Sequence, residues 1–271
     1  MLNKNIKAAV AGIGGRVGTR TAQLIAESEG INLSAGLVSK GSARVGKDLS
    51  EIIGGAPVGI KMSDTIEEVI ESCEVIIDFT NAESSIKNLE AAAKAKKAIV
   101  IGPTGFFSEQ LDRIKELSKE IPVVLAPNMS LGVNVLIKTV ADVARLLGDA
   151  YDVEIIEAHH RFKKDAPSGT ALRLAESVAE ALGRNLKEVG VYARQGLTGE
   201  RTIKEIGMQS IRAGDIVGDH TVMFGGMGER IEITHRAHSR DTFVRGAIKA
   251  AKWLPGKEPG LYDMQDVLGI K

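Results

Sequence analysis

The chain has a single cysteine, no excess of either charge and no long apolar segment. One thiol, Cys73, can form neither an intrachain disulfide nor a thiolate metal cluster, and this fits a protein of the reducing cytosol. The 35 basic and 35 acidic residues cancel, which argues against a general binder of nucleic acid or of membrane surfaces. No apolar run approaches the roughly 20 residues of a membrane helix, and the polar start Met1–Lys7 does not read as a signal peptide. We expect a cytoplasmic protein with neither kind of partner.

A strand, a glycine-rich turn and a helix open the chain. Ile6–Ala11 is predicted as a buried strand and residues 19–28 as a helix, with Gly12–Gly18 between them. Glycines permit a tight turn and let the backbone approach a pyrophosphate at the helix N-terminus. The spacing Gly-x-x-Gly-x-x-Gly departs from the strict dinucleotide fingerprint, but its context between strand and helix predicts the same function. We expect cofactor contacts from Gly12, Ile13, Gly14, Gly15, Arg16 and Val17.

The second predicted strand, Ile31–Ser39, bears on the choice of cofactor. An acidic residue at the end of this strand usually binds the ribose 2′-hydroxyl of NAD. Here no Asp or Glu lies between Glu29 and Asp48, and the strand is followed by Lys40 and Arg44. A hydroxyl and cations complement a 2′-phosphate better, so the sequence favours NADPH, with NADH possible. Ser39 and Lys40 are the expected contacts.

Strands and helices alternate up to about Ser130, the pattern of a doubly wound parallel sheet. Ligands of such sheets bind beyond the carboxyl ends of the strands. The expected strands are 58–62, 75–78, 98–101 and 122–126, and the expected helices are 65–71, 84–96 and 108–120. The loops after the last two strands are therefore expected to contact the cofactor through Gly102, Pro103, Thr104, Ala126, Pro127, Asn128 and Met129.

The pattern changes after Ser130. A helix is predicted over 134–147, a strand over 153–158, a helix over 169–182, and a strand-rich run over 191–235 that includes hairpin strands at 220–224 and 230–235. Helices predicted over 240–254 and 263–268 return to the first domain. The fold class is therefore α/β, a Rossmann-like doubly wound parallel sheet (residues 1–130 and 240–271) plus a second α/β domain with an open mixed sheet (residues 131–239).

The connection from Glu157 to Thr170 groups several side chains that can bind anions or transfer protons. It holds His159, His160 and Lys163 between a predicted strand and a helix that opens at Ser168-Gly169-Thr170. A helix N-terminus presents unpaired N–H groups and partial positive charge, lysine adds a cation, and histidine is a proton donor near neutral pH. The segment therefore predicts a binding site for an anion with a proton donor next to it. We expect no metal, because neighbouring histidines on a strand point to opposite faces and no carboxylate or thiolate has ligand spacing.

Taken together, these motifs resemble the 4-hydroxy-tetrahydrodipicolinate reductase (dihydrodipicolinate reductase) family over essentially the whole chain. The most specific match is the stretch E-x-H-H-x-x-K-x-D-A-P-S-G-T-A that begins at Glu157. The resemblance implies an NAD(P)H-dependent reductase of lysine and diaminopimelate biosynthesis, typically a homotetramer whose domains close about hinges near 130 and 240. It implies that His159 donates a proton and that Lys163 is the second catalytic residue. The expected contacts to a small dicarboxylate substrate are His160, Lys163, Ser168, Gly169 and Thr170.

The chain departs from the family pattern in three places, the end of the second strand and two cofactor loops. Val38 and Ser39 stand where an acidic residue and an arginine are frequent, which puts a preference for NADH in doubt. Pro103 and Pro127 each remove one N–H donor from a cofactor loop.

Two other functions are compatible with a glycine-loop fold. One is a different Rossmann oxidoreductase that acts on a small oxo or imino acid. An acyl-enzyme semialdehyde dehydrogenase would need a nucleophilic cysteine, and Cys73 precedes a predicted strand, away from the crevice. The other is an NAD(P)-sensing regulator without catalysis, which would need a recognition module that the sequence does not display.

Overall fold

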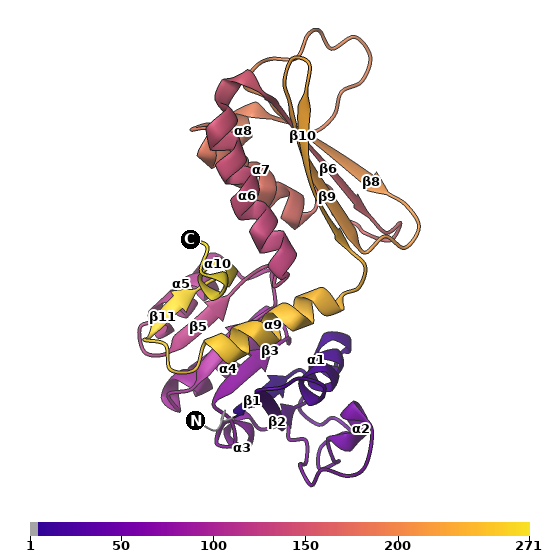
Figure 1. Cartoon of the computed structure of the whole chain (residues 1–271). Coiled ribbons are helices and arrows are strands. Elements are labelled where there is room, and N and C mark those ends of the chain that lie inside the picture. Colours follow the sequence, from indigo (N-terminus) through magenta and orange to yellow (C-terminus); the bar gives the residue numbers. More distant parts are fainter. Residues whose placement is uncertain (1–4) are drawn as a thin grey trace. The chain divides into compact units, whose positions relative to one another are not determined.

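The computed structural model describes residues 5–271 (Figure 1). Residues 1–4 lie outside the described part of the chain. They belong to the polar start Met1–Lys7, in which no signal peptide was expected. The contacts divide the chain into two units. Unit 1 runs to Ser130 and resumes over Asp241–Gly269, whereas unit 2 comprises Leu131–Arg240 with Ile270–Lys271. Within residues 5–271, no helix combines the length and the apolar composition of a membrane span.

Unit 1 is built on a six-stranded parallel sheet, as predicted. The strand order is β2-β1-β3-β4-β5-β11, so the order reverses between β1 and β3. The four residues of β3 and of β4 are all buried and nearly all aliphatic, the composition of strands covered on both faces. The bounds are β1 Ile6–Ala11, β2 Ile31–Leu37, β3 Val75–Asp78, β4 Ala98–Ile101, β5 Pro122–Leu125 and β11 Gly260–Tyr262.

Helices cover both faces of this sheet. On one face α1 (Arg16–Ala26) packs beside α9 (Asp241–Trp253), with α10 (Met264–Leu268) against α9. On the other face lie α3 (Ile66–Ile70), α4 (Ala82–Lys94) and α5 (Ser108–Leu117). The chain returns to unit 1 at α9, so both C-terminal helices belong to this unit.

The loop region after β2 differs from the prediction. No strand forms at 58–62; this stretch makes only an isolated bridge, Asp48 to Lys61. The carboxylate of Asp48 instead accepts hydrogen bonds from the N–H groups of Val58 (3.0 Å) and Gly59 (2.8 Å). Side-chain capture of two successive N–H groups removes the donors that a strand needs. A short helix, α2 (Ser50–Ile53), precedes this loop and was not predicted.

Unit 2 contains a five-stranded mixed sheet of order β10-β9-β6-β8-β7. The β6–β8 and β7–β8 pairs are parallel, whereas β6–β9 and β9–β10 are antiparallel, which confirms the open mixed sheet and the predicted hairpin. Helices α6 and α7 pack together and cover the sheet. The bounds are α6 Leu131–Leu147, η1 Gly148–Ala150, β6 Asp152–His159, α7 Gly169–Ala181, α8 Leu186–Val189, β7 Gly190–Val191, β8 Ile206–Arg212, β9 Gly218–Gly225 and β10 Arg230–Ala237.

The central strand β6 alternates strictly between a buried and a half-buried face. Val153, Ile155, Glu157 and His159 are the buried residues. The first two belong to the apolar core with Phe224. Along this face the side chains change from apolar, at Val153 and Ile155, to polar, at Glu157 and His159. The polar pair lies at the end of the strand.

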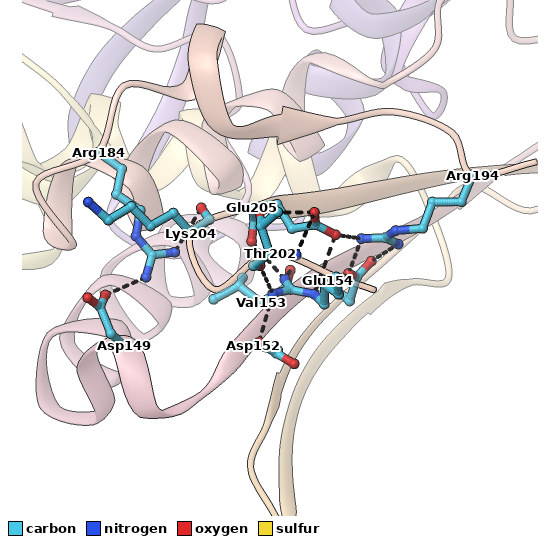
Figure 2. A network of polar contacts seen from close by, with 10 residues as sticks. Asp149, Asp152, Val153, Glu154, Arg184, Arg194, Thr202, Lys204 and Glu205 are labelled. Carbon is cyan, nitrogen blue, oxygen red and sulfur yellow. Dashed lines mark hydrogen bonds and ion pairs between the residues drawn. The ribbon is translucent and has the colours of Figure 1, made fainter. Parts of the chain in front are cut away.

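An ion-pair network on the other face of β6 holds the long connection between β7 and β8 (Figure 2). Arg194 binds the carboxylates of Glu154 (2.7 Å) and Glu205 (2.6 Å). Arg201 binds Glu154 as well, at 3.2 Å, and donates to the carbonyl of Val153 at 2.9 Å. Because these arginines each bond several partners, they fix the connection more firmly than single exposed pairs would.

Candidate active site

The glycines of the first turn are required by close backbone contacts. Gly12 has φ +78° and lies against the carbonyl oxygen of Phe79, 3.0 Å from where a Cβ would be. A Cβ on Gly18 would lie 2.1 Å from the carbonyl oxygen of Gly12. Gly15 donates its N–H to that same oxygen at 2.9 Å. The three spaced glycines therefore make the turn and let α1 begin directly above it, at Arg16 rather than at Thr19 as predicted.

The N-terminus of α1 is suited to an anion. Its cap is Gly15, which supplies no side-chain hydrogen bond, and its first turn contains no acidic residue. The first N–H groups of a helix have no partner within the helix and carry partial positive charge. Together with the space that the glycines leave, this fits the pyrophosphate of a dinucleotide.

A cavity of about 690 Å³ opens beside this turn. It lies at the carboxyl ends of β1, β2 and β3, where the strand order reverses, which is the usual ligand crevice of such sheets. Of the expected cofactor contacts, five line it: Gly12, Gly14, Gly15, Ser39 and Lys40. Three others do not: the Ile13 side chain is fully buried, while Arg16 and Val17 lie exposed in the first turn of α1.

The loop after β2 supplies the cations of the cavity. Lys40 and Arg44 both line it, and Arg44 reaches across to donate to the carbonyl of Gly14 at 2.9 Å. Asp64 also lines the cavity, but its carboxylate accepts the N–H of Gly41 at 2.8 Å. Arg44 was not among the expected contacts, although the lack of acidic residues around it pointed to this loop.

The loop after β3 also lines the cavity, although none of its residues was among the expected contacts. Thr80 and Asn81 border the cavity. The turn is shaped by buried Asp78, whose carboxylate accepts from the N–H of Thr80 at 2.8 Å and from the amide of Asn88 at 3.1 Å. Burial raises the pKa of Asp78. The strand-end rule that indicated the other loops applied equally here.

The two remaining loops of the prediction follow β4 and β5 at the same edge, but neither borders the cavity. These are residues 102–104 and 126–129. Gly102 is nevertheless in direct contact with a cavity-lining residue, because a Cβ there would lie 2.3 Å from the ring of Phe79.

A second polar cluster lies in unit 2, at the end of β6. His159 is the last residue of the strand and is buried. Its Nδ1 lies 2.5 Å from a carboxylate oxygen of Glu157. Burial lowers the pKa of His159, and the hydrogen bond and charge of Glu157 act in the opposite direction. The net result is a lowered pKa, which favours the neutral ring in the protein alone.

Glu157 is a buried carboxylate with three kinds of partner. Its side chain is 1% exposed. Arg212 of β8 binds both of its oxygens, at 2.9 and 2.8 Å, and the N–H of Ser168 donates to it at 3.3 Å. Burial alone would raise the pKa of Glu157, but the hydrogen bonds from Arg212 and His159 outweigh it and hold the pKa at about 2. Glu157 is thus ionised at neutral pH.

His220 of β9 completes the cluster. Its ring meets that of His159 edge-on, with centroids 5.2 Å apart, and its Nε2 lies 3.1 Å from the hydroxyl oxygen of Ser168. Burial lowers the pKa of His220 to about 4, so the ring is neutral at pH 7. Ser168 also caps α7, since its Oγ accepts the N–H of Ala171 at 3.2 Å.

The expected substrate contacts all lie along the connection from β6 to α7. Gly169 and Thr170 form the first turn of α7, behind the Ser168 cap. Lys163 is mostly buried and pairs with Asp165 at 2.9 Å. His160 follows the strand and its ring lies 6.3 Å from that of Phe162. The connection therefore combines a cation, an imidazole and a helix N-terminus, the groups that bind carboxylates.

Three members of this cluster were assigned no role from the sequence: Glu157, Arg212 and His220. Only Glu157 left a usable signal, since it lies two residues before His159 on a strand and so shares its face. Among residues 5–271 no three His, Cys, Asp or Glu side chains are grouped so as to hold a metal ion.

Cys73 lies just before β3, in the apolar core of unit 1. Burial raises the pKa of its thiol to about 11, so it is not an activated nucleophile. This buried position speaks against acyl-enzyme chemistry.

Known proteins match this chain over nearly its full length. Residues 6–129 and 132–268 match the family models described as dihydrodipicolinate reductase, N-terminus and C-terminus. The chain is 60% identical to the 4-hydroxy-tetrahydrodipicolinate reductase of Syntrophobacter fumaroxidans, covering 98% of this chain and 100% of the relative. For the relative of the same name from Geotalea daltonii the identity is 57%, with the same coverage.

Solved structures agree. The dipicolinate-bound dihydrodipicolinate reductase of Paenisporosarcina sp. TG-14 superimposes with a TM-score of 0.76 at 25% identity, covering 97% of this chain and 98% of that one. An amine dehydrogenase from Mycobacterium smegmatis, at 13% identity and a TM-score of 0.60 over 96% and 95% of the two chains, shares the fold alone. With both halves matched by one family, the chain belongs to the dihydrodipicolinate reductases.

Proposed function

We propose that this chain reduces 4-hydroxy-tetrahydrodipicolinate to tetrahydrodipicolinate in the biosynthesis of lysine and diaminopimelate, with His159 as the proton donor. Family membership supports the reaction. The observation that carries the assignment of His159 is its position: a buried imidazole, paired with a buried carboxylate, at the start of a connection that offers Lys163 and a helix N-terminus.

The cofactor is proposed to bind in unit 1. The Gly12–Gly15 turn and the N-terminus of α1 would hold the pyrophosphate, and Ser39, Lys40 and Arg44 would hold a 2′-phosphate, which favours NADPH over NADH. After the 4-hydroxyl group of the substrate has left as water, a bound reduced nicotinamide would supply the hydride for C4 of the resulting unsaturated ring, which leaves an enamine. The residues at 102–104 and 126–129 remain proposed contacts at the same sheet edge.

The residues of unit 2 are proposed to hold the substrate and move one proton. Lys163, Ser168, His160 and the amides of Gly169 and Thr170 would bind the two carboxylates and fix the ring. His159 then protonates C3. The negative charge of a bound dicarboxylate favours the imidazolium form, which offsets the lowering of the His159 pKa by burial.

Substitution of His159 by Gln tests the assignment. We expect kcat to fall by about 10²–10⁴-fold, the usual contribution of general acid catalysis, with little change in KM for either ligand. The measurement is the loss of NADPH absorbance with freshly generated substrate. Lys163→Ala should differ by raising the substrate KM while it lowers kcat, because it removes a charge that binds the ground state. Near-normal turnover of H159Q would remove His159 from the role.

The same assay separates the alternatives. A different oxidoreductase of small oxo or imino acids would prefer another substrate, and a regulator would bind NADPH without oxidising it. We further propose a homotetramer in the cytoplasm, as the family resemblance implies; light scattering would report the number of chains.

A further inference from the structure

Glu157 and His159 form one unit on the buried face of β6. The two residues are spaced by two, so their side chains leave the same face of the strand, and Glu157 Oε2 meets His159 Nδ1. A carboxylate only accepts hydrogen bonds, so the proton between them sits on Nδ1. This leaves Nε2 as the ring atom from which a proton can depart.

The other nitrogen of His159 lies beside a glycine. Nε2 is close to Gly218, the first residue of β9, where a Cβ would lie only 3.0 Å from it. A side chain at Gly218 would therefore crowd the atom that must release its proton.

From this geometry we infer that Glu157 is a positioning residue of the reductase, which fixes the tautomer of His159 so that the proton given to the substrate leaves from Nε2. The inference rests on the proposed function of His159. In the step itself the Nε2–H bond of the imidazolium breaks and its electron pair stays on the ring, while the C=C π pair of the reduced enamine forms the C–H bond at C3 and a C=N bond results. Nδ1 keeps its proton and its bond to Glu157 throughout, so Glu157 stays ionised.

Glu157 is the carboxylate in direct contact with the His159 ring. Lys163 of the connection and Arg212 of β8 are cations, and both oppose protonation of His159. His220 of β9, with His235 of β10 behind it, adds imidazoles whose pKa values are lowered by burial. Without Glu157, the ring would lose the anion in contact with it, while Lys163 and Arg212 would still disfavour the imidazolium that the reaction requires.

The same carboxylate also holds the proposed substrate-binding turn. Its Oε1 accepts the N–H of Ser168, and Arg212 donates to the carbonyl of Asp165 at 2.6 Å while it binds Glu157. One buried ion pair therefore ties the proton donor to the turn that opens α7. The distance between the acid and the carboxylate-binding amides is set through Glu157.

The test is the pH dependence of kcat in Glu157→Gln. Gln keeps the shape but not the charge, so His159 holds its proton less well. One charge-assisted hydrogen bond corresponds to about 10- to 100-fold in proton affinity. We expect kcat to fall by about that factor at pH 9, the loss to shrink as the pH is lowered towards 6, and the KM for NADPH to stay unchanged. A loss of equal size at every pH, as a purely structural role predicts, or no loss at all, would overturn the inference.

Glu154→Gln is the matched control. Glu154 lies on the same strand and also binds two arginines, Arg194 (Figure 2) and Arg201. Its side chain leaves the opposite face of the strand from His159. This variant removes one half-buried, arginine-paired charge from β6 and should leave the pH profile of kcat unchanged.

A second measurement does not depend on a folded E157Q variant. In the wild-type enzyme, ¹⁵N-histidine NMR above the pKa of His159, with the resonance assigned by its absence in H159Q, should show the proton on Nδ1. A proton on Nε2 would refute the inference. The two proposals fail separately: normal turnover of H159Q would refute the role of His159, whereas inactive H159Q with a pH-independent E157Q defect would refute only the role of Glu157.

Discussion

Gly18→Ala should damage both the stability of unit 1 and its affinity for cofactor, although alanine is the better helix former. The added Cβ would lie 2.1 Å from the oxygen and 2.6 Å from the carbon of the Gly12 carbonyl. Contacts below 3.0 Å are essentially never made by Cβ atoms, so α1 or the turn must move by about 0.9 Å. Both partners are backbone, and no side chain can rotate away.

The two opposing effects can be compared. Alanine gains about 1 kcal/mol in a helix interior over glycine, whereas overpacking costs about 1–3 kcal/mol and falls at the upper end where only backbone can give. We expect a net loss of about 1–2 kcal/mol, seen as a fall of about 4 °C in the melting temperature of unit 1. Because the shift displaces the N–H groups at the start of α1, the Kd for NADPH should rise at least about tenfold, the effect of about 1.4 kcal/mol.

Fluorescence titration with NADPH and thermal unfolding measure these two quantities. Gly225→Ala is the control, since a Cβ there meets open space and the φ of Gly225 is ordinary; it should leave both unchanged or raise the melting temperature slightly. An unaltered Kd and melting temperature in G18A would show that the turn tolerates the methyl group and that the close approach is not what the glycine provides.

Two further predictions concern the cations of the cavity and the buried imidazole. Arg44→Ala should raise KM for NADPH by about tenfold or more, because a charge-assisted hydrogen bond to phosphate contributes at least that factor to binding. KM for NADH should stay nearly unchanged. Lys47→Ala is the control in the same steady-state kinetics, since Lys47 is a cation of the same loop that does not line the cavity. The folded state depresses the pKa of His220 to about 4, so its contribution to stability is complete above about pH 6.5 and is lost as the pH falls through about 4, a total of about 3 kcal/mol. Urea unfolding at pH 7 and pH 4.5 should therefore show a smaller loss of stability in His220→Asn than in the wild type, and equal losses would contradict the depressed pKa.

The sequence predicted the strands best where short aliphatic runs gave a clear signal. Val75–Asp78 and Ala98–Ile101 are short aliphatic runs bounded by turns, and both were found with their predicted ends. Prediction was wrong at 58–62, where the alternating pattern suggested a strand but the distant Asp48 takes the N–H groups of Val58 and Gly59. A contact across ten residues through a side chain leaves no periodic trace.

The candidate site shows the same division. The connection from His159 to Thr170 could be found because its residues are contiguous. Arg212 and His220 could not, because they reach the cluster from β8 and β9, through strand pairing that places them beside His159 and Glu157. Register between strands that are 50 or more residues apart in this chain depends on the tertiary fold, which local pattern does not determine.

Unit 1 is formed by two separate segments of the chain, and this affects the order in which the two units can fold during synthesis. The sheet of unit 1 lacks its edge strand β11, and one of its faces lacks α9, until the last thirty or so residues have been made. Unit 2 is almost contiguous, so during synthesis it is complete while the apolar surface under α9, including Val100 and Ile77, still awaits its cover. Truncation before α9 would therefore leave a nascent dinucleotide fold prone to aggregate, while the histidine cluster of unit 2 is already assembled.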